Sequence, residues 1–439
     1  MLKRKIEADL QKWKNTKNRK PLIIKGCRQC GKTYSVLDFA KKNYENVIYL
    51  NFFENPDYAS VFSGSLNVDS ITLMISALLG EKAVFEKDRT ILIFDEIQEC
   101  PEARTALKFF QIDGRYDVVC TGSLLGVKRY GKEPRSVPVG YETVIDMYPL
   151  DFEEFLWANH ITDSIVELLK TCLQNESPVP EALHKRMKEL FLQYACVGGM
   201  PDVVNIFLEN NRMDEVLKAQ RNIVRSYKDD MVKYADRSMK SSIKECFESI
   251  PKQLGKENKK FQYSVVKKGG TAAKYAGSLQ WIEDAGIIAR CYNLMKPELP
   301  LDKNADQDIF KVYMCDCGLF ASILEDGTQF DILQGRLYGY KGAIFENLIA
   351  DIFIKSGRKL YYYRKDSGLE IDFIIRHQGE VSLVEVKANT GNTKSAKTIL
   401  KHPDKYHVKQ AIKLGDYNIG RAGQILTIPF YMAFLLRGY

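Results

Sequence analysis

Short apolar runs alternate with amphipathic segments in the first third of the chain. Each run is rich in β-branched side chains, which predicts a strand buried on both faces. The segments between the runs carry apolar residues at helical spacing, as Val36, Phe39 and Ala40 do. This alternation predicts an α/β fold with a mostly parallel sheet covered by helices. The runs are PLIIKG (21–26), VIYLNFFEN (47–55), TILIFDEIQ (90–98) and YDVVCTGSLLG (116–126).

The pattern changes after about residue 150, where amphipathic helices dominate as far as residue 250. The stretch 240–295 predicts three helical pieces followed by a strand, IIARCYNL, an order typical of a winged helix-turn-helix. The first of these helices is expected to stop near Pro251. The second piece, FQYSVVKK (261–268), suits either a helix or a strand.

A winged helix in this region serves one of two purposes. Lys267, Lys268 and Lys274 lie near its second and third helices, where they could contact nucleic acid phosphates. The alternative is a winged helix used for packing or protein contact, with these lysines on a solvated face.

The last hundred residues carry a third pattern. KGAIFENLIADIFIKSG (341–357) predicts a helix, and residues 361–388 predict three strands in succession.

Composition adds limits rather than a function. The chain has 439 residues, which is too long for one ordinary core, and we expect more than one domain. Its net charge of +8 permits a polyanionic partner without demonstrating one. The basic amino-terminal segment lacks the apolar core of a secretory signal, and we find no apolar run long enough to span a membrane. A cytoplasmic protein is therefore expected.

GCRQCGKT (26–33) has the G-x-x-x-x-G-K-T spacing of a phosphate-binding loop between a strand and a helix. The backbone N–H groups of such a loop and the amino end of the helix face the phosphates of a nucleotide. Lys32 would reach the β- and γ-phosphates, and the Thr33 hydroxyl would ligate Mg²⁺. The predicted nucleotide-binding residues here are Gly26, Cys27, Arg28, Gln29, Cys30, Gly31, Lys32, Thr33 and Tyr34.

The same residues also contain a C-x-x-C pair, Cys27 and Cys30, which suits zinc or dithiol chemistry. A zinc site needs a second pair of ligands. The other close pair, Cys315 and Cys317, is separated by one residue and lies far along the chain. We therefore interpret these cysteines as loop positions whose backbone matters more than their sulfur.

Two further strand ends add residues that a nucleotide site needs. In TILIFDEIQ, Asp95 would hold the Mg²⁺ shell, and Glu96 would orient or deprotonate the attacking water. The hydroxyls of Thr121 and Ser123 end the next strand and would sense the state of the nucleotide; an ordinary strand-to-loop transition is an equal alternative. Together with the phosphate loop, these residues predict an ATPase. We find no N/T-K-x-D motif for guanine.

The carboxyl-terminal strands carry a second possible active site. Asp372 begins the FII run, and Glu385 and Lys387 are two residues apart in VEVKA, so they share one face of a strand. Two carboxylates that hold Mg²⁺ and a lysine that positions the attacking water are what metal-dependent phosphodiester cleavage needs. Glu346 would add a metal ligand from the preceding helix. The alternative is a half-buried strand whose charged residues face solvent.

These motifs, in this order, resemble bacterial and archaeal AAA-type P-loop ATPases that end in a region called domain of unknown function 4143. The resemblance covers nearly the whole chain. The motifs that carry it are RQCGKT, IFDEIQ, TGS, SVPVGYE, GGMPDVV, IPKQL, KFQY, KVYMCDCGLF, FEN, EIDF and VEVKA.

The resemblance implies four segments: an AAA-type core (1–150), a helical lid or linker (151–215), a winged-helix region (216–330) and a restriction-endonuclease-like α/β domain (331–439). It also implies that Lys32, Thr33, Asp95 and Glu96 are the family's phosphate-loop and acidic residues, and that residues 121–123 form its sensor.

The resemblance further implies that Asp372, Glu385 and Lys387 match a PD-(D/E)-x-K nuclease signature. Asp372 departs from that signature, because Glu370 and Ile371 precede it where the signature has proline. Glu370 therefore competes for the same role.

These observations favour a cytoplasmic, Mg²⁺-dependent ATPase whose nucleotide state controls a winged-helix and nuclease-like module that engages DNA or RNA. The alternative is an ATP-gated switch or scaffold that binds a protein partner and has an inert nuclease-like fold. AAA-type ATPases often form oligomers in which a neighbouring subunit supplies an arginine. The candidates are Arg129, Arg135, Arg221 and Arg225.

Overall fold

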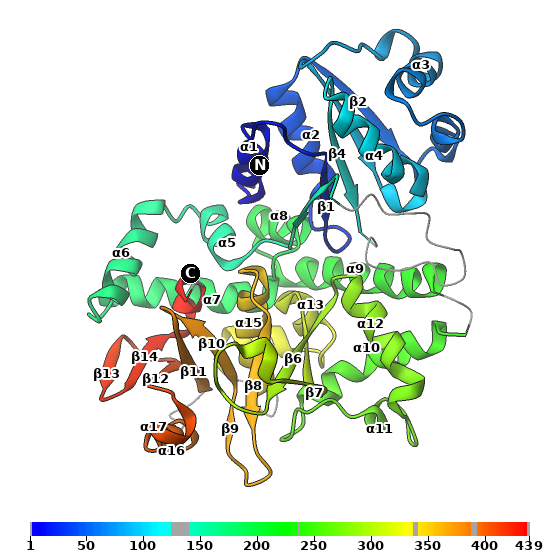
Figure 1. The fold of residues 1–439 in the computed structure, drawn as a ribbon. Helices are drawn as coiled ribbons and strands as arrows, with labels where there is room; N and C mark the ends of the chain where they lie inside the picture. The colour runs from blue at the N-terminus through cyan, green and yellow to red at the C-terminus, as the bar shows by residue number, and fades with distance from the viewer. Residues whose placement is uncertain (1, 124–139, 236–237, 337–340, 388–392, 437–439) are drawn as a thin grey trace. The chain divides into compact units, whose positions relative to one another are not determined.

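The structure, a computed structural model, describes residues 2–123, 140–235, 238–336, 341–387 and 393–436 (Figure 1). The chain forms two compact units. The amino-terminal unit comprises Arg4–Tyr148 and the turn Asp284–Gly286. The carboxyl-terminal unit comprises Pro149–Glu283 and Ile287–Tyr439 together with the first three residues. The four segments expected from the resemblance remain predictions.

The amino-terminal unit contains a five-stranded parallel sheet in the order β2-β3-β4-β1-β5, flanked by helices, which confirms the predicted α/β fold. The strands are β1 (Leu22–Lys25), β2 (Asn46–Asn51), β3 (Thr90–Asp95), β4 (Asp117–Gly122) and β5 (Thr143–Asp146). The helices are α1 (Ile6–Lys14), α2 (Lys32–Asn43), α3 (Val68–Leu79) and α4 (Pro101–Asp113), with 3₁₀ turns η1 (Pro56–Phe62), η2 (Gly80–Lys82) and η3 (Ile97–Glu99).

Burial and register explain why the polar residues of this sheet gather at one edge. Every residue of β3 is buried, as expected for a strand covered by helices on both faces. Asn51 at the end of β2 pairs in register with Asp95 at the end of β3. Strand β4 flanks β3 on the other side, where Phe94 pairs with Cys120. The carboxyl ends of three strands therefore bring Asn51, Asp95 and Thr121 together.

The carboxyl-terminal unit begins with helices. These are α5 (Phe152–Ala158), α6 (Asp163–Gln174), α7 (Glu181–Val197), α8 (Pro201–Asn210), α9 (Met213–Tyr234), α10 (Lys240–Leu254), α11 (Tyr263–Val266) and α12 (Ala272–Asp284). The helix was predicted to end near Pro251, but α10 continues to Leu254. Proline lacks the N–H of one helical hydrogen bond, but its carbonyl still accepts the N–H of Gly255 at 2.9 Å. FQYSVVKK, which suited either element, contains the short helix α11.

Two further sheets complete this unit. The order β7-β6-β8-β9 joins β6 (Ile288–Leu294), β7 (Ala305–Met314), β8 (Leu360–Arg364) and β9 (Glu370–Ile371). The order β10-β11-β12-β14-β13 joins β10 (Phe373–His377), β11 (Glu380–Lys387), β12 (Gln410–Gly415), β13 (Gly420–Ala422) and β14 (Ile425–Pro429). The remaining elements are α13 (Cys317–Ser322), α14 (Thr328–Leu333), α15 (Lys341–Lys355), α16 (Lys394–Leu400), α17 (Pro403–Tyr406), η4 (Leu301–Asn304) and η5 (Phe430–Leu435).

Residues 360–387 form four strands, where three were predicted over 361–388. Asp372 interrupts the run, so that β9 belongs to one sheet and β10 to the other. The first sheet also pairs β6 with β8 in parallel, so strands on both sides of residue 330 share one sheet. Asp372 thus lies at the junction of the two sheets, a position that the strand pattern alone does not give.

A buried ion cluster anchors the carboxyl end of α15. The Lys355 ammonium lies 2.9 Å from Asp351 and 3.4 Å from Asp316. Asp316 also accepts the backbone N–H of Gly199 at 2.7 Å, in the turn between α7 and α8. This cluster fixes α15, whose first half carries Glu346, to the helical part of the unit.

Candidate functional site

The phosphate loop lies between β1 and α2, as its spacing predicts. Gly31 has φ 95°, a left-handed conformation that favours glycine, and Gln29 also has positive φ at 63°. The Lys32 ammonium folds back over the loop, 3.0 Å from the carbonyl oxygen of Gly26 and 2.8 Å from that of Cys27. Among the described residues, no side chain caps the amino end of α2. That end is therefore free to meet an anion.

Asp95 is the centre of the site, and the groups that bind it are neutral. Its carboxylate is 2 % exposed and accepts the Thr33 hydroxyl at 3.1 and 3.0 Å. Further donors are the hydroxyls of Tyr49 (2.7 Å) and Thr121, the Asn51 amide (3.3 Å) and the Glu96 backbone N–H (3.1 Å). Within the described residues, no cation pairs with Asp95. Its negative charge is therefore left uncompensated.

This donor set fits a magnesium ion. Mg²⁺ prefers oxygen ligands and is usually held by one or two protein groups together with substrate phosphates. The contact between Thr33 and Asp95 places a hydroxyl and a carboxylate at the end of the phosphate loop. An ion held there would meet the charge that the neutral donors leave on Asp95.

Glu96 points back to the next strand. It has φ 53° and ψ 48°, an uncommon left-handed conformation for a residue other than glycine. Its Oε2 accepts the Ser123 hydroxyl at 3.2 Å and the Gln98 amide at 2.5 Å. Strained backbone of this kind often occurs at active sites.

Sequence reasoning missed Tyr49, Asn51 and Gln98. The first two end a strand whose register with β3 is not visible in the sequence. Gln98 offered a signal, since it follows the acidic pair by two residues.

Cys27 and Cys30 are both buried in the loop. A hydrogen bond from Cys27 lowers the pKa of Cys30 to about 6, and the charges of Lys32 and Arg4 add to this effect against the opposing effect of burial. Arg4 also donates to the Cys30 carbonyl at 2.9 Å. The lowered pKa favours the ionised form of Cys30, whose sulfur lies 4.0 Å from the Lys32 ammonium.

At the carboxyl end, the structure brings the predicted residues together. Phe373 on β10 pairs in register with Val384 on β11, which sets Asp372 beside Glu385. Asp372 accepts the backbone N–H of Val386 at 2.7 Å. Glu385 accepts the Ala396 N–H at 2.9 Å with one oxygen and the Lys387 ammonium at 2.8 Å with the other.

Glu346, on α15, has two lysine partners that sequence reasoning missed. The Lys311 ammonium lies 2.9 Å from one of its oxygens, and Lys259 pairs with the other. Tyr313 also donates to Glu346. The sequence contained a signal for these partners, since Lys311 and Tyr313 are two residues apart along β7 and therefore share one face of the strand.

Burial and charge have opposite effects on these groups. Burial opposes ionisation of Glu346, but Lys311 and Lys259 outweigh it and hold its pKa below the usual range. Burial lowers the pKa of Lys311, but Glu346, Glu370 and Asp372 outweigh it and raise that pKa above the usual range. Burial and the nearby Glu346 raise the pKa of Asp372 to about 6.

The four arginines considered as candidates for the arginine that a neighbouring subunit supplies lie in different parts of the chain. Arg221 and Arg225 lie on α9, where Arg221 pairs with Asp326. Arg129 and Arg135 lie outside the described residues.

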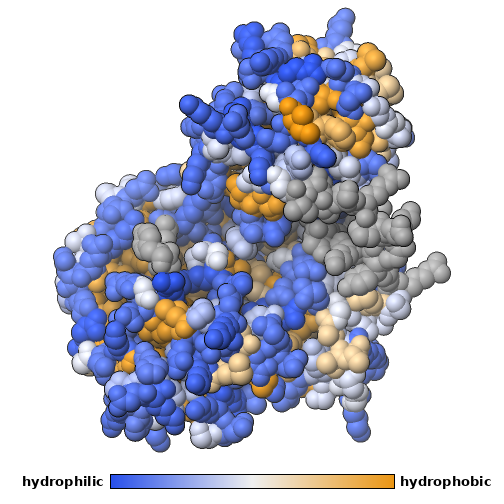
Figure 2. Space-filling model, in the orientation of Figure 1, coloured by the Kyte–Doolittle hydropathy of each residue, from blue (hydrophilic) through white to orange (hydrophobic). Residues whose placement is uncertain are grey.

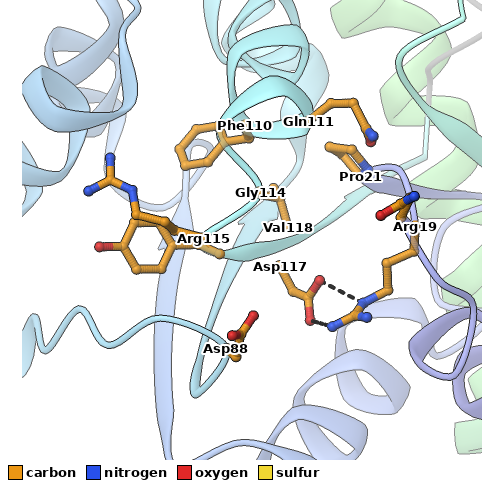
Figure 3. Close-up of a pocket in the computed structure, with 11 residues that line it drawn as sticks. Arg19, Pro21, Asp88, Phe110, Gln111, Gly114, Arg115, Asp117 and Val118 are labelled. Atoms are coloured by element: carbon orange, nitrogen blue, oxygen red, sulfur yellow. Dashed lines mark hydrogen bonds and ion pairs between the residues drawn. The ribbon is translucent and has the colours of Figure 1, made fainter.

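A separate cavity of about 340 Å³ lies at the opposite edge of the parallel sheet (Figure 3). Arg19 makes a bidentate contact with Asp117 there, at 2.7 and 2.5 Å, and Tyr44 also donates to Asp117 at 2.6 Å. The cavity adjoins the amino ends of β1 and β4. It is therefore distinct from the phosphate loop at their carboxyl ends.

Three family models match the chain in sequence. Residues 18–156 match an AAA domain, residues 188–329 match domain of unknown function 8612, and residues 341–431 match domain of unknown function 4143. The chain therefore carries an AAA domain of the P-loop ATPase type in its amino-terminal part and a domain of unknown function 4143 in its carboxyl-terminal part. The family resemblance and the predicted ATPase activity are thereby confirmed.

Solved structures similar to this ATPase include the Walker-type ATPase PABY2304 of Pyrococcus abyssi, with 14% identity over 74% of this chain and 96% of that chain and a TM-score of 0.41. C. elegans PCH-2 has 18% identity, 38% and 45% coverage and a TM-score of 0.22. AMPPCP-bound DnaA from Aquifex aeolicus has 11% identity, 64% and 86% coverage and a TM-score of 0.25. None of these structures has a TM-score of 0.5 or more, so the assignment of the ATPase domain rests on the family models. No curated protein matches the chain.

The ATPase therefore binds and hydrolyses ATP. Among its described helices, none has the length and apolar character needed to span a membrane.

Replacing Lys32 tests the phosphate loop. Lys32→Ala removes the cation that we expect to contact the β- and γ-phosphates, and we predict about 10- to 100-fold weaker ATP binding by calorimetry. Lys41→Ala, on the exposed face of the same helix, is the matched control and should bind as the unchanged chain does. Equal affinity in the two variants would contradict the assignment.

Titrating the thiolate tests the charge around the loop. The difference in ultraviolet thiolate absorbance between the unchanged chain and Cys30→Ser should show a transition near pH 6 rather than near the ordinary 9.0, because Cys27, Lys32 and Arg4 favour the ionised form. Lys32→Met should move the transition to higher pH. A transition at the ordinary value in the unchanged chain would contradict this electrostatic picture.

Proposed function

We propose that this ATPase uses Mg²⁺-bound ATP and that its nucleotide state controls a carboxyl-terminal module that engages nucleic acid. Thr33 and Asp95 would hold the ion, which would supply positive charge to stabilise the phosphates. Glu96 would orient or deprotonate the attacking water. Its contact with Ser123 at 3.2 Å supports a role for the end of β4 in sensing the γ-phosphate.

The turn between α12 and β6 supports the proposed control. Its residues, Asp284–Gly286, belong to the amino-terminal unit, whereas the elements before and after it belong to the other unit. Gly286 has φ 73°, and a Cβ there would lie 3.3 Å from the backbone nitrogen of Cys27. Within the amino-terminal unit the turn therefore lies close to the phosphate loop, and we propose that it is the covalent link to α12 and β6.

A basic surface on α16 and α17 is the observation that carries the nucleic acid part of the proposal. Lys397, Lys401 and Lys405 are exposed and, among the described residues, have no ion-pair partner. Figure 2 shows the surface at these helices as hydrophilic. The helix α16 starts beside Glu385, whose carboxylate accepts the Ala396 N–H. Exposed lysines without ion-pair partners are what contact with the phosphates of a polyanion needs.

One lysine of the predicted winged helix is less available, because Lys267 pairs with Glu245 at 3.0 Å. Lys268 and Lys274 are exposed and, among the described residues, have no ion-pair partner. We assign the phosphate contacts to the basic surface on α16 and α17. For the predicted winged helix we propose a role in packing or in minor contacts.

The second candidate is the ATP-gated switch that binds a protein partner. The observation in its favour is that Lys311 and Lys259 already occupy both oxygens of Glu346, which suits an inert nuclease-like fold. A module that does not cut can still bind nucleic acid, so the two candidates differ in the partner and not in the chemistry.

Salt-dependent binding of labelled duplex DNA, followed by fluorescence anisotropy, tests the proposal. Lys397→Ala, Lys401→Ala and Lys405→Ala combined should weaken binding by at least about tenfold at about 150 mM salt. They should also reduce the slope of log affinity against log salt by about 2 to 3, because three phosphate contacts are lost. The matched control replaces Lys185, Lys218 and Lys296, which are exposed on the same unit and remove the same charge.

Equal losses in the two triple variants would contradict the assigned surface. The same assay with ATP-loaded Glu96→Gln and with the ADP-bound chain tests whether nucleotide state controls binding. We predict different affinities for DNA in the two states. No salt-dependent binding by a chain that still hydrolyses ATP would favour the protein-binding switch.

A further inference from the structure

We propose that Lys311 is the resident cation of the carboxyl-terminal carboxylate cluster and that this cluster holds no divalent metal. The cluster comprises Glu346, Glu370, Asp372 and Glu385. The proposal goes beyond nucleic acid binding, because it states that the module lacks the metal that phosphodiester cleavage at these residues would need.

Lys311 occupies the place between two carboxylates of the cluster. Its ammonium lies 2.9 Å from Glu346 and 2.9 Å from Glu370, and its side chain is 1 % exposed. A metal ion bridging these carboxylates would have to displace a buried ammonium from the interior. Breaking a buried ion pair by removing one partner is costly, because a charge is left uncompensated.

Protein donors also engage other oxygens of the cluster, and Asp372 accepts the backbone N–H of Val386 with one of its two oxygens. Lys259 and Tyr313 bind Glu346, whose two oxygens are thus both taken. Glu385 gives one oxygen to the Ala396 N–H and the other to Lys387. Consistently, no group of three or more His, Cys, Asp or Glu side chains in the described part of the chain is arranged to hold a metal ion.

The formal charges of the cluster already cancel. The cluster contains four carboxylates and four cations: Glu346, Glu370 and Glu385 pair with Lys259, Lys311, Lys387 and Arg364, and Asp372 accepts a backbone N–H. A divalent cation would therefore leave uncompensated positive charge in a largely buried site, whether or not it displaced Lys311. Asp95 shows the opposite arrangement, since all its donors are neutral and its charge remains available to a cation.

Lys311 also explains why these carboxylates are assembled at all. It extends from β7, Glu346 from α15 and Glu370 from β9, while Lys259 comes from the segment between α10 and α11. The ion pairs therefore join parts of the chain that lie on both sides of the predicted boundary at residue 330. In this account, Glu346, which was expected to be a metal ligand, and Glu370, which competes with Asp372 for a place in the signature, hold one folded unit together.

Counting bound Mn²⁺ by electron paramagnetic resonance tests the proposal on the full chain. With a non-hydrolysable ATP analogue, the unchanged chain should bind one Mn²⁺, and Asp95→Asn should bind none at the same Mn²⁺ concentration. An Asp95→Asn chain that still binds one Mn²⁺, lost on adding Asp372→Asn, would overturn the proposal. This count does not depend on DNA binding, so it stands or falls separately from the proposed function.

A second variant tests Lys311 itself. Lys311→Met removes the resident cation, and we predict a second bound Mn²⁺ that disappears when Asp372→Asn is added. A folded Lys311→Met chain, verified by circular dichroism, that still binds a single Mn²⁺ would overturn the role of Lys311. If Lys311→Met does not fold, the Mn²⁺ count of Asp95→Asn decides by itself whether the cluster holds a metal.

Discussion

A buried charge must be compensated, and the two units of this chain meet that requirement in different ways. Around Asp95, hydroxyls, an amide and a backbone N–H satisfy the oxygens as hydrogen-bond acceptors but supply no positive charge. Around Glu346, the partners include the ammonium groups of Lys311 and Lys259. The first arrangement attracts a cation, and the second already contains one.

This difference organises the functional account. The amino-terminal unit has an anion-accepting loop, an uncompensated carboxylate and a nearby acid, Glu96, which together suit the hydrolysis of Mg²⁺-bound ATP. The carboxyl-terminal unit has a neutralised cluster beside a basic surface. Such a unit can hold a polyanion through its lysines without contributing a metal to the chemistry. In this account the chemical step belongs to one unit and the contact with nucleic acid to the other.

Much of the fold could be predicted from local sequence. Buried strands such as β3 are continuous apolar runs, and the phosphate loop has a fixed spacing, so both are visible without a structure. The carboxyl-terminal helix and the E-x-K strand were also predicted, although the interruption at Asp372 was not. The end of α10 was predicted too early, because proline in the last turn of a helix removes one hydrogen bond without ending the helix.

The partners of the charged residues could not be predicted, because they are distant in sequence. Tyr49 and Asn51 reach Asp95 through the register of β2 with β3. Lys311 reaches Glu346 across 35 positions, through the packing of β7 and α15. A motif search finds the acidic residues but not the groups that neutralise them. The same sequence motif is therefore compatible with a metal site or with an ion-pair cluster.

The most direct test of the account is cleavage of plasmid DNA and single-stranded RNA with Mg²⁺ or Mn²⁺, with and without ATP, under conditions where binding of each substrate is verified. The account predicts ATP hydrolysis and bound but intact nucleic acid in every condition. Cleavage by the unchanged chain that is lost in both Asp372→Ala and Glu385→Ala, while ATP hydrolysis continues, would contradict it.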